Sequence, residues 1–158
     1  MALVYARQMA IKSAGPMPCP VTSPSTVHQS KFSMGTVLAL AARFGHAGLS
    51  EFDADYLAPA TVALRDKVSM VLDPEVDTAY PARWIGKVQV TTTDGRHLAA
   101  RVDEPKGDPG NTLSRPELED KAQRLAAYRG GATAAEMQTV IAQVWGLAEA
   151  ATVPRFLA

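Results

Sequence analysis

The sequence predicts an α+β fold of two layers, in which an antiparallel sheet containing the hairpin 87–102 carries helices packed on one face. Two runs of alternating character flank Asp94-Gly95, and this dipeptide is the strongest short-range signal for a hairpin. An apolar run at 37–44 has helical spacing. Two capping boxes also precede amphipathic runs in the last third of the chain. An apolar hairpin face needs helices against it, and this predicts the two layers.

Composition narrows the class of protein. The chain has 158 residues, 47% of them hydrophobic and 20% charged, and its formal net charge is zero. A balanced charge gives no overall attraction to nucleic acid or to an anionic membrane, and no apolar run is long enough to span a bilayer. Cys19 is the only cysteine, which excludes an internal disulfide and fits a reducing compartment. No convincing signal peptide is present, so we expect a cytoplasmic protein with neither nucleic-acid nor membrane partners.

The first part of the chain is expected to differ from the rest. Residues 1–26 are predicted to form an N-terminal strand and a Pro-rich loop, and residues 27–158 a single α+β domain. Residues 2–12 are ambiguous between strand and helix, and we favour a strand that ends near Ile11. Four prolines within 13–26 predict an extended loop.

The next segment is the one with a possible binding role. Ser33 is a suitable N-cap and Gly45 a suitable end for a helix. Five apolar residues predict the buried face of this helix: Val37, Leu38, Leu40, Ala41 and Phe44. His28, Ser30 and Lys31 come just before its start. A helix N-terminus with free amides beside an ammonium group suits a carboxylate or a phosphate. The alternative is that Lys31 is solvated and Ser33 only caps.

The middle of the chain predicts short elements. A helical turn opens at Ser50, and a helix with Pro59 in its first turn runs to about Asp66. Residues 67–72 predict a strand, and 73–83 a loop. The hairpin then follows, and alternate residues of its two strands share one face: Val88, Val90, Thr92, Leu98, Ala100 and Val102.

Two helices are predicted after the hairpin. One opens at the capping box of Ser114 and Glu117 and runs to about Tyr128, and the other opens at that of Thr133 and Glu136 and runs to about Glu149. Leu118, Ala122 and Leu125 form the apolar row of the first helix. The second helix has an apolar stripe of Met137, Val140, Ile141, Val144, Trp145 and Ala148. We interpret that stripe as core rather than as a groove for a cofactor or partner.

No motif for self-contained catalysis is recognised. The sequence has no Gly-rich phosphate loop, no His-x-x-x-His or Cys-x-x-Cys pair and no nucleophile elbow. Asp103, Glu104 and Asp108 share one loop, where they could hold a hard cation or simply face water. We therefore predict no catalytic residue, no metal site and no cofactor.

Two segments resemble a known family. His28 to Ala42 is similar to the helix-opening segment of the C-terminal domain of the MmgE/PrpD family, the group of 2-methylcitrate dehydratase and cis-aconitate decarboxylase. A stronger resemblance joins the hairpin to the helix that follows it, through Asp94-Gly95-Arg96, Val102, Lys106-Gly107-Asp108-Pro109, Leu113-Ser114, Glu117-Leu118 and Lys121. The resemblance covers residues 20–158.

The resemblance implies a lid. Enzymes of this family have a helical N-terminal domain that supplies most of the acid and base residues, and an α+β domain that covers the site. This chain resembles the lid alone, so we expect it to need a separate helical catalytic domain. The resemblance also implies that Lys31, Ser33 and Thr36 bind substrate at the edge of the pocket. Thr36 departs from the family, because many relatives have a tyrosine there that points toward the substrate.

Two functions remain open from the sequence. In the first, the chain is the lid portion of a 2-methylcitrate dehydratase-like enzyme that acts on small polycarboxylates and is not catalytic on its own. In the second, it is a stand-alone, non-catalytic α+β module that binds a small carboxylate or mediates self-association. A lid without its partner exposes apolar surface, and we therefore expect a homo-oligomer or a complex with a helical domain.

Overall fold

The α+β class is confirmed, but the chain divides into two compact units. A computed structural model describes residues 2–5 and 21–153. Unit 1 extends to Asn111 and unit 2 begins at Thr112. We predicted a single domain over 27–158, and the boundary between the two units lies within that range. The expected strand end near Ile11 and most of the Pro-rich loop lie outside the described residues.

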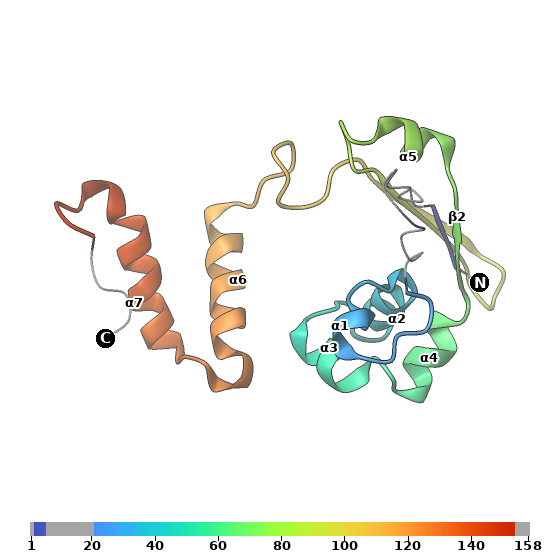
Figure 1. Cartoon of the computed structure of the whole chain (residues 1–158), viewed down its shortest axis with the longest axis horizontal. Helices are drawn as coiled ribbons and strands as arrows, with labels where there is room; N and C mark the ends of the chain where they lie inside the picture. Colours follow the sequence, from blue (N-terminus) through green and yellow to red (C-terminus); the bar gives the residue numbers. More distant parts are fainter. Residues whose placement is uncertain (1, 6–20, 154–158) are drawn as a thin grey trace, which may run out of the picture. The chain divides into compact units, whose positions relative to one another are not determined.

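Unit 1 is built on a four-stranded sheet whose order is β2-β1-β3-β4 (Figure 1). The strands are β1 (Ala2–Tyr5), β2 (Val68–Val71), β3 (Gly86–Thr91) and β4 (His97–Val102). β1 pairs antiparallel with β3 and parallel with β2, so the sheet is mixed rather than purely antiparallel. The helices between β1 and β2 return the chain to the same end of the sheet, and such a crossover makes the two strands parallel.

The hairpin of β3 and β4 places the predicted residues of its two strands on one face. Val88 lies opposite Ala100, and Val90 lies opposite Leu98. The apolar face is only partly covered, because every residue of β4 is exposed and Leu98 and Val102 are each 50% exposed. Successive strand residues face opposite sides, so Lys87 and its partner Arg101 share the other face.

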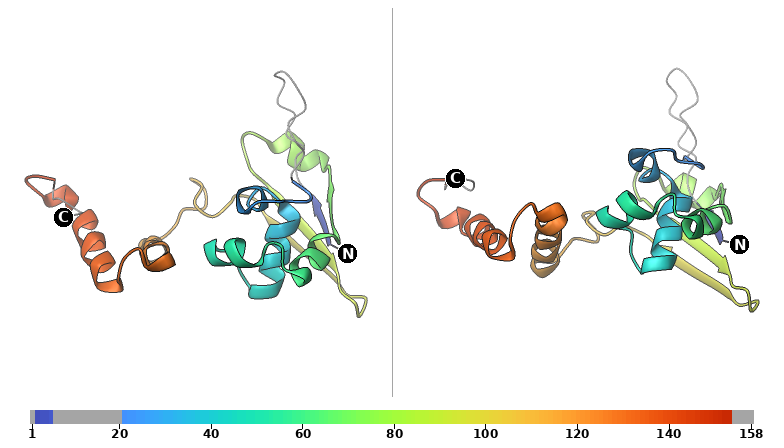
Figure 2. Two further views of the ribbon diagram at one scale, coloured as in Figure 1. Left: turned by 60° about the horizontal axis from the view of Figure 1, so that its bottom comes forward. Right: turned by 90° about the horizontal axis from the view of Figure 1, so that it is seen from below.

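Four helices gather beside the sheet (Figures 1 and 2): α1 (Val27–Ser30), α2 (Met34–Phe44), α3 (Leu49–Asp55) and α4 (Pro59–Arg65). α2 starts after Ser33 and ends at Gly45, as predicted. Its buried face differs from the predicted one. Thr36, Ala39 and Leu40 are buried, whereas Phe44 is 38% exposed. α2 lies close to α4 and β2 at its start, because a methyl group on Gly35 would be 3.0 Å from Cγ of Arg65 and 3.6 Å from Cβ of Val68.

The prediction of a loop over 73–83 is wrong in its first half. Residues Pro74–Ala79 form helix α5. Asp73 caps it by accepting hydrogen bonds from the amides of Glu75 and Val76, and Pro74 occupies the first helical position. Val76 is buried at 4% exposure, which attaches the helix to the core. The Asp-Pro pair, interpreted as a stop for the preceding strand, is also the start of this helix.

Unit 2 is a pair of helices, α6 (Arg115–Ala127) and α7 (Ala134–Trp145), followed by short 3-10 turns at Tyr128–Gly130 and Leu147–Glu149 respectively. Both predicted capping boxes form: Glu117 accepts from the amide of Ser114 at 2.7 Å, and Glu136 accepts from the amide of Thr133 at 2.8 Å. The prediction that the stripe of α7 is core is wrong for its second half, whereas Met137 and Val140 are half-buried. Ile141 is buried, but Val144 and Trp145 are 46% and 39% exposed.

Candidate functional site

The start of α2 is built around two buried hydroxyl groups. Oγ of Ser33 accepts a hydrogen bond from the amide of Thr36 at 3.3 Å and another from its Oγ1 at 3.0 Å. The backbone carbonyl of Ser33 accepts from the amide of Val37 at 2.9 Å. Ser33 and Thr36 are 1% and 0% exposed. The two hydroxyls therefore satisfy each other inside the protein while they cap the helix.

The turn before α2 is fixed by α1. Thr26 caps α1 and accepts from the amide of Gln29 at 3.1 Å. Ser30, which is fully buried, donates its hydroxyl to the carbonyl of Val27 at 2.7 Å. The amide of Ser33 in turn donates to the carbonyl of Ser30 at 3.1 Å. These local bonds hold the chain in one path into α2. Of the three residues between the two helices, Lys31 and Phe32 are exposed and Ser33 is buried.

The outer side of this turn is basic and aromatic. Lys31 is exposed, and Phe32 is 62% exposed with its ring 5.1 Å from that of His28. The first turn of α2 contains no acidic residue. The Ser33 cap uses the amides of Thr36 and Val37 and leaves those of Met34 and Gly35 outside it. A lysine beside a helix N-terminus makes this surface electropositive.

The three residues predicted to bind substrate, Lys31, Ser33 and Thr36, differ in their exposure. It brings Ser33 and Thr36 into direct contact and buries both. Lys31 lies at the surface as the residue that ends α1. In this structure the two hydroxyls are engaged with each other, so they shape the helix start, and Lys31 is the one of the three whose side chain is exposed.

Arg43 connects three of the helices of unit 1. Its guanidinium donates to Oγ1 of Thr61 at the start of α4 and lies 3.4 Å from Oδ1 of Asp55 at the end of α3. Thr61 is completely buried, so Arg43 supplies a hydrogen-bond donor to a hydroxyl that water does not reach. This link joins the C-terminal end of α2 to α3 and α4.

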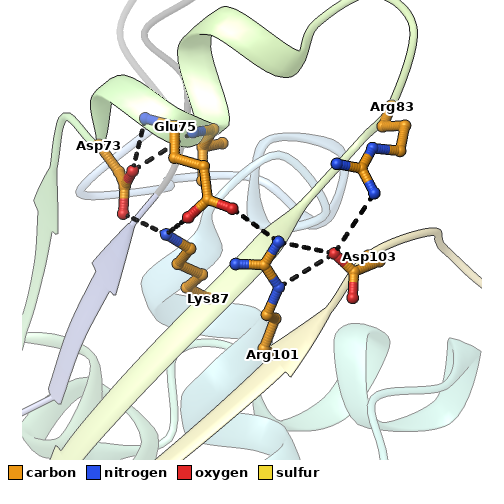
Figure 3. Close-up of polar contacts among 7 residues, drawn as sticks. Asp73, Glu75, Arg83, Lys87, Arg101 and Asp103 are labelled. Atoms are coloured by element: carbon orange, nitrogen blue, oxygen red, sulfur yellow. Dashed lines mark hydrogen bonds and ion pairs between the residues drawn. The ribbon is translucent and has the colours of Figure 1, made fainter.

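A second polar cluster joins α5 to the two strands of the hairpin (Figure 3). Glu75 lies between two cations that are partners across the strands: Nζ of Lys87 is 2.5 Å and Nη2 of Arg101 is 2.8 Å from its carboxylate. Lys87 also donates to Asp73 at 2.8 Å, and Arg101 donates to Asp103 at 2.7 Å. Arg83 completes the cluster at 3.9 Å from Asp103.

The contacts within the cluster shift the pKa values of its members. Hydrogen bonds from Arg101 and then Lys87 lower the pKa of Glu75 to about 2. The bond from Lys87 lowers the pKa of Asp73, and the bond from Arg101 lowers that of Asp103. The two carboxylates that surround Lys87, Asp73 first and Glu75 second, raise its pKa. All of these groups therefore stay charged at neutral pH.

This ion cluster is balanced, with three carboxylates facing three cations. A shallow depression of about 390 Å³ lies between Lys87 and Arg101, but Glu75 already bridges the two cations. The arrangement therefore suits a structural role, in which it holds α5 on the sheet. Sequence reasoning missed the cluster because its members lie on separate elements. The alternation of residues 87–102 does indicate part of the cluster, because it places Lys87 and Arg101 on the same face of the hairpin.

The loop after the hairpin is closed by its own contacts. Asp103 is engaged with Arg101, and the carbonyl of Glu104 accepts from Nδ2 of Asn111 at 3.0 Å. Within the described residues no group of three or more His, Cys, Asp or Glu side chains is placed to hold a metal ion. No helix of the described segments is long and apolar enough to cross a membrane.

Comparison with protein-family models gives a match. A protein-family model described as the MmgE/PrpD C-terminal domain matches residues 4–147, which is most of the chain. A separate comparison with curated proteins finds no match.

Proposed function

The chain belongs to the MmgE/PrpD family through its C-terminal domain, and from this premise we propose that it forms the lid portion of a 2-methylcitrate dehydratase-like enzyme. In this proposal the substrate is a small polycarboxylate. The outer surface of the α2 start binds one of its carboxylates, and a separate helical domain carries out the proton transfers. We place the reaction in the cytoplasm, in keeping with the single cysteine.

The observation that carries the proposal is the polarity of the α2 start. Lys31 is exposed there, the first turn of α2 has no acidic side chain, and two amides of that turn are outside the Ser33 cap. A carboxylate at this position would receive a charge-assisted hydrogen bond from Lys31 and would interact favourably with the helix dipole. Ser33 and Thr36 contribute by holding the first turn in place.

The exposed aromatic residue beside Lys31 supports a second contact. Phe32 is 62% exposed, although its side chain is apolar. In the proposal, the helical domain covers Phe32 when the lid closes, and the carboxylate is then removed from water. A drier environment strengthens the attraction between Lys31 and its ligand.

Reconstitution tests this proposal. The purified chain is assayed with 2-methylcitrate and with cis-aconitate, alone and mixed with a helical-domain protein of the family. We expect turnover in the mixture and none from the chain alone. Lys31→Ala is expected to raise KM in the mixture, and Lys121→Ala, on α6 of the other unit, serves as the matched control. Turnover by the chain alone, or a mixture indifferent to Lys31→Ala, would contradict the proposal.

The alternative is a non-catalytic module that binds a carboxylate or associates with itself. The half-exposed apolar residues of α6 and α7, such as Leu125 and Val144, favour association with another protein surface. The same assay separates the two functions. Binding of cis-aconitate that weakens with Lys31→Ala, without turnover in any mixture, would support the module.

A further inference from the structure

The outer strand β2 has the properties of a strand that pairs with a second copy of itself. β2 and β4 are the two outer strands of the sheet. Along β2 and the residue after it, Ser69, Met70, Val71 and Leu72 are all exposed, and Met70 and Leu72 are 37% and 56% exposed. An uncharged, apolar outer strand is a template for pairing with another strand.

The charges at its two ends determine the partner. Lys67 precedes the strand and Asp73 follows it, with no charged residue between them. If two copies pair antiparallel around a two-fold axis at Met70, residues at equal distance from Met70 face each other. Val71 then meets Ser69, Leu72 meets Val68, and Asp73 meets Lys67 of the other copy. An identical partner thus forms two ion pairs, one at each end of the paired strands.

Asp73 can accept this additional contact. Its Oδ1 receives the amides of Glu75 and Val76, and its Oδ2 receives Lys87. The side chain is 14% exposed, and a carboxylate has about four acceptor positions, so Oδ2 can accept one further bond. Lys67 and Asp73 also share one face of the strand, because they are separated by an even number of residues.

The other outer strand is less suited to self-pairing. β4 carries Arg101 within the strand and Arg96 just before it, and charged side chains of this kind protect sheet edges from pairing. Two copies joined through β4 would bring four arginines together. We therefore propose that two copies of this chain associate through β2, which joins their sheets into one, and that this association is independent of the proposed enzymatic role.

Cross-linking tests the register. In a Cys19→Ser background, Met70→Cys places two thiols opposite each other at the two-fold axis, within the distance that a disulfide spans. Leu72→Cys is the matched control, because each thiol would face Val68 and lie far from its counterpart. We expect a disulfide-linked dimer from Met70→Cys under mild oxidation and none from Leu72→Cys. Equal cross-linking of both variants, or of neither, would overturn the proposal.

Sedimentation equilibrium tests the end contacts without oxidation. The unmodified chain is expected to form a dimer, and Lys67→Glu should raise its dissociation constant at least tenfold, because glutamate would face Asp73. Lys121→Glu, at a residue that is also exposed but lies on α6, should leave the dissociation constant unchanged. Circular dichroism of each variant confirms that it folds. A monomer at all soluble concentrations, or a dimer indifferent to Lys67→Glu, would overturn the proposal.

Discussion

Glu75 accepts a hydrogen bond from Nη2 of Arg101 at 2.8 Å, so that the short helix α5 is held by β4, one of the two outer strands of the sheet. The two residues are 26 positions apart in the chain. The same carboxylate binds Lys87 on the neighbouring strand. The position of α5 therefore depends on the side chains of Glu75, Lys87 and Arg101. It also depends on pH, because protonation would remove the charge of the Glu75 carboxylate.

Stability is expected to fall in acid through Glu75. Its pKa is about 2 in the folded protein and 4.5 ordinarily, so the folded state binds fewer protons than the unfolded state between these values. The stabilisation is fully present above about pH 4.5 and declines as the pH falls toward 2. Urea denaturation from pH 7 to pH 3 should therefore show a steeper loss for the unmodified chain than for Glu75→Gln. A Glu149→Gln control should follow the unmodified chain, and identical slopes for all three would contradict the expectation.

The buried hydroxyl pair at the start of α2 should contribute to stability. Ser33→Ala removes the cap and leaves Oγ1 of Thr36 without its acceptor, so we expect a loss of about 1–3 kcal/mol in the free energy of unfolding. Thr36→Val removes one donor but keeps the amide bond to Ser33 and should cost about 1 kcal/mol. Urea denaturation measures both. A larger loss for Thr36→Val than for Ser33→Ala would show that the cap is not the main contribution.

Two glycines of the hairpin are expected to respond in opposite directions to alanine. Gly95 has a φ of +85°, which an alanine adopts at a cost of about 1–2 kcal/mol. Gly86 lies in β3 without a positive φ and with nothing within 4 Å of an added methyl group. Gly86→Ala should therefore raise stability by about 0.5 kcal/mol. Thermal unfolding measures the two changes, and a shift of the same sign for both would contradict this account of the turn.

Arg43 should matter more to stability than Arg96, an exposed arginine of the same unit. Arg43→Met keeps the aliphatic stem but leaves the buried hydroxyl of Thr61 without its donor, and we expect a loss of about 1–3 kcal/mol. Arg96→Met, whose side chain is 68% exposed at the hairpin, is the control and should change little. Equal effects in urea denaturation would mean that the Arg43 link does not stabilise the helical layer.

Local features were predictable from the sequence. The cap at Ser33, the turn at Asp94-Gly95 and the capping boxes at Ser114 and Thr133 all depend on residues within a few positions of one another. The strand before Asp73 was predicted for the same reason. In each case the chemistry of one short segment determines the structure.

Features that depend on distant segments were not predictable. The parallel pairing of β1 with β2 joins residues more than sixty positions apart, for example Ala2 and Val68. The ion cluster around Glu75 likewise needs the sheet before its members meet. The stripe of α7 was predicted as core because amphipathic helices usually bury their apolar side, and sequence alone does not say how much partner surface a two-helix unit provides.

The candidate site was predictable in part. Lys31 and Ser33 were recognised from the spacing before the helix, and the structure places Lys31 at the surface. The burial of Thr36 against Ser33 was not predicted, because it depends on how closely α2 approaches α4. That close approach is reflected in the sequence only as Gly35.

A titration of the purified chain with cis-aconitate, followed through the amide resonances of unit 1, tests the central claim most directly. We predict that the largest shifts occur at Lys31, Met34 and Gly35, and that they weaken in Lys31→Ala but persist in Lys121→Ala. Largest shifts elsewhere in the chain, or equal shifts in the two variants, would contradict a carboxylate site at the start of α2.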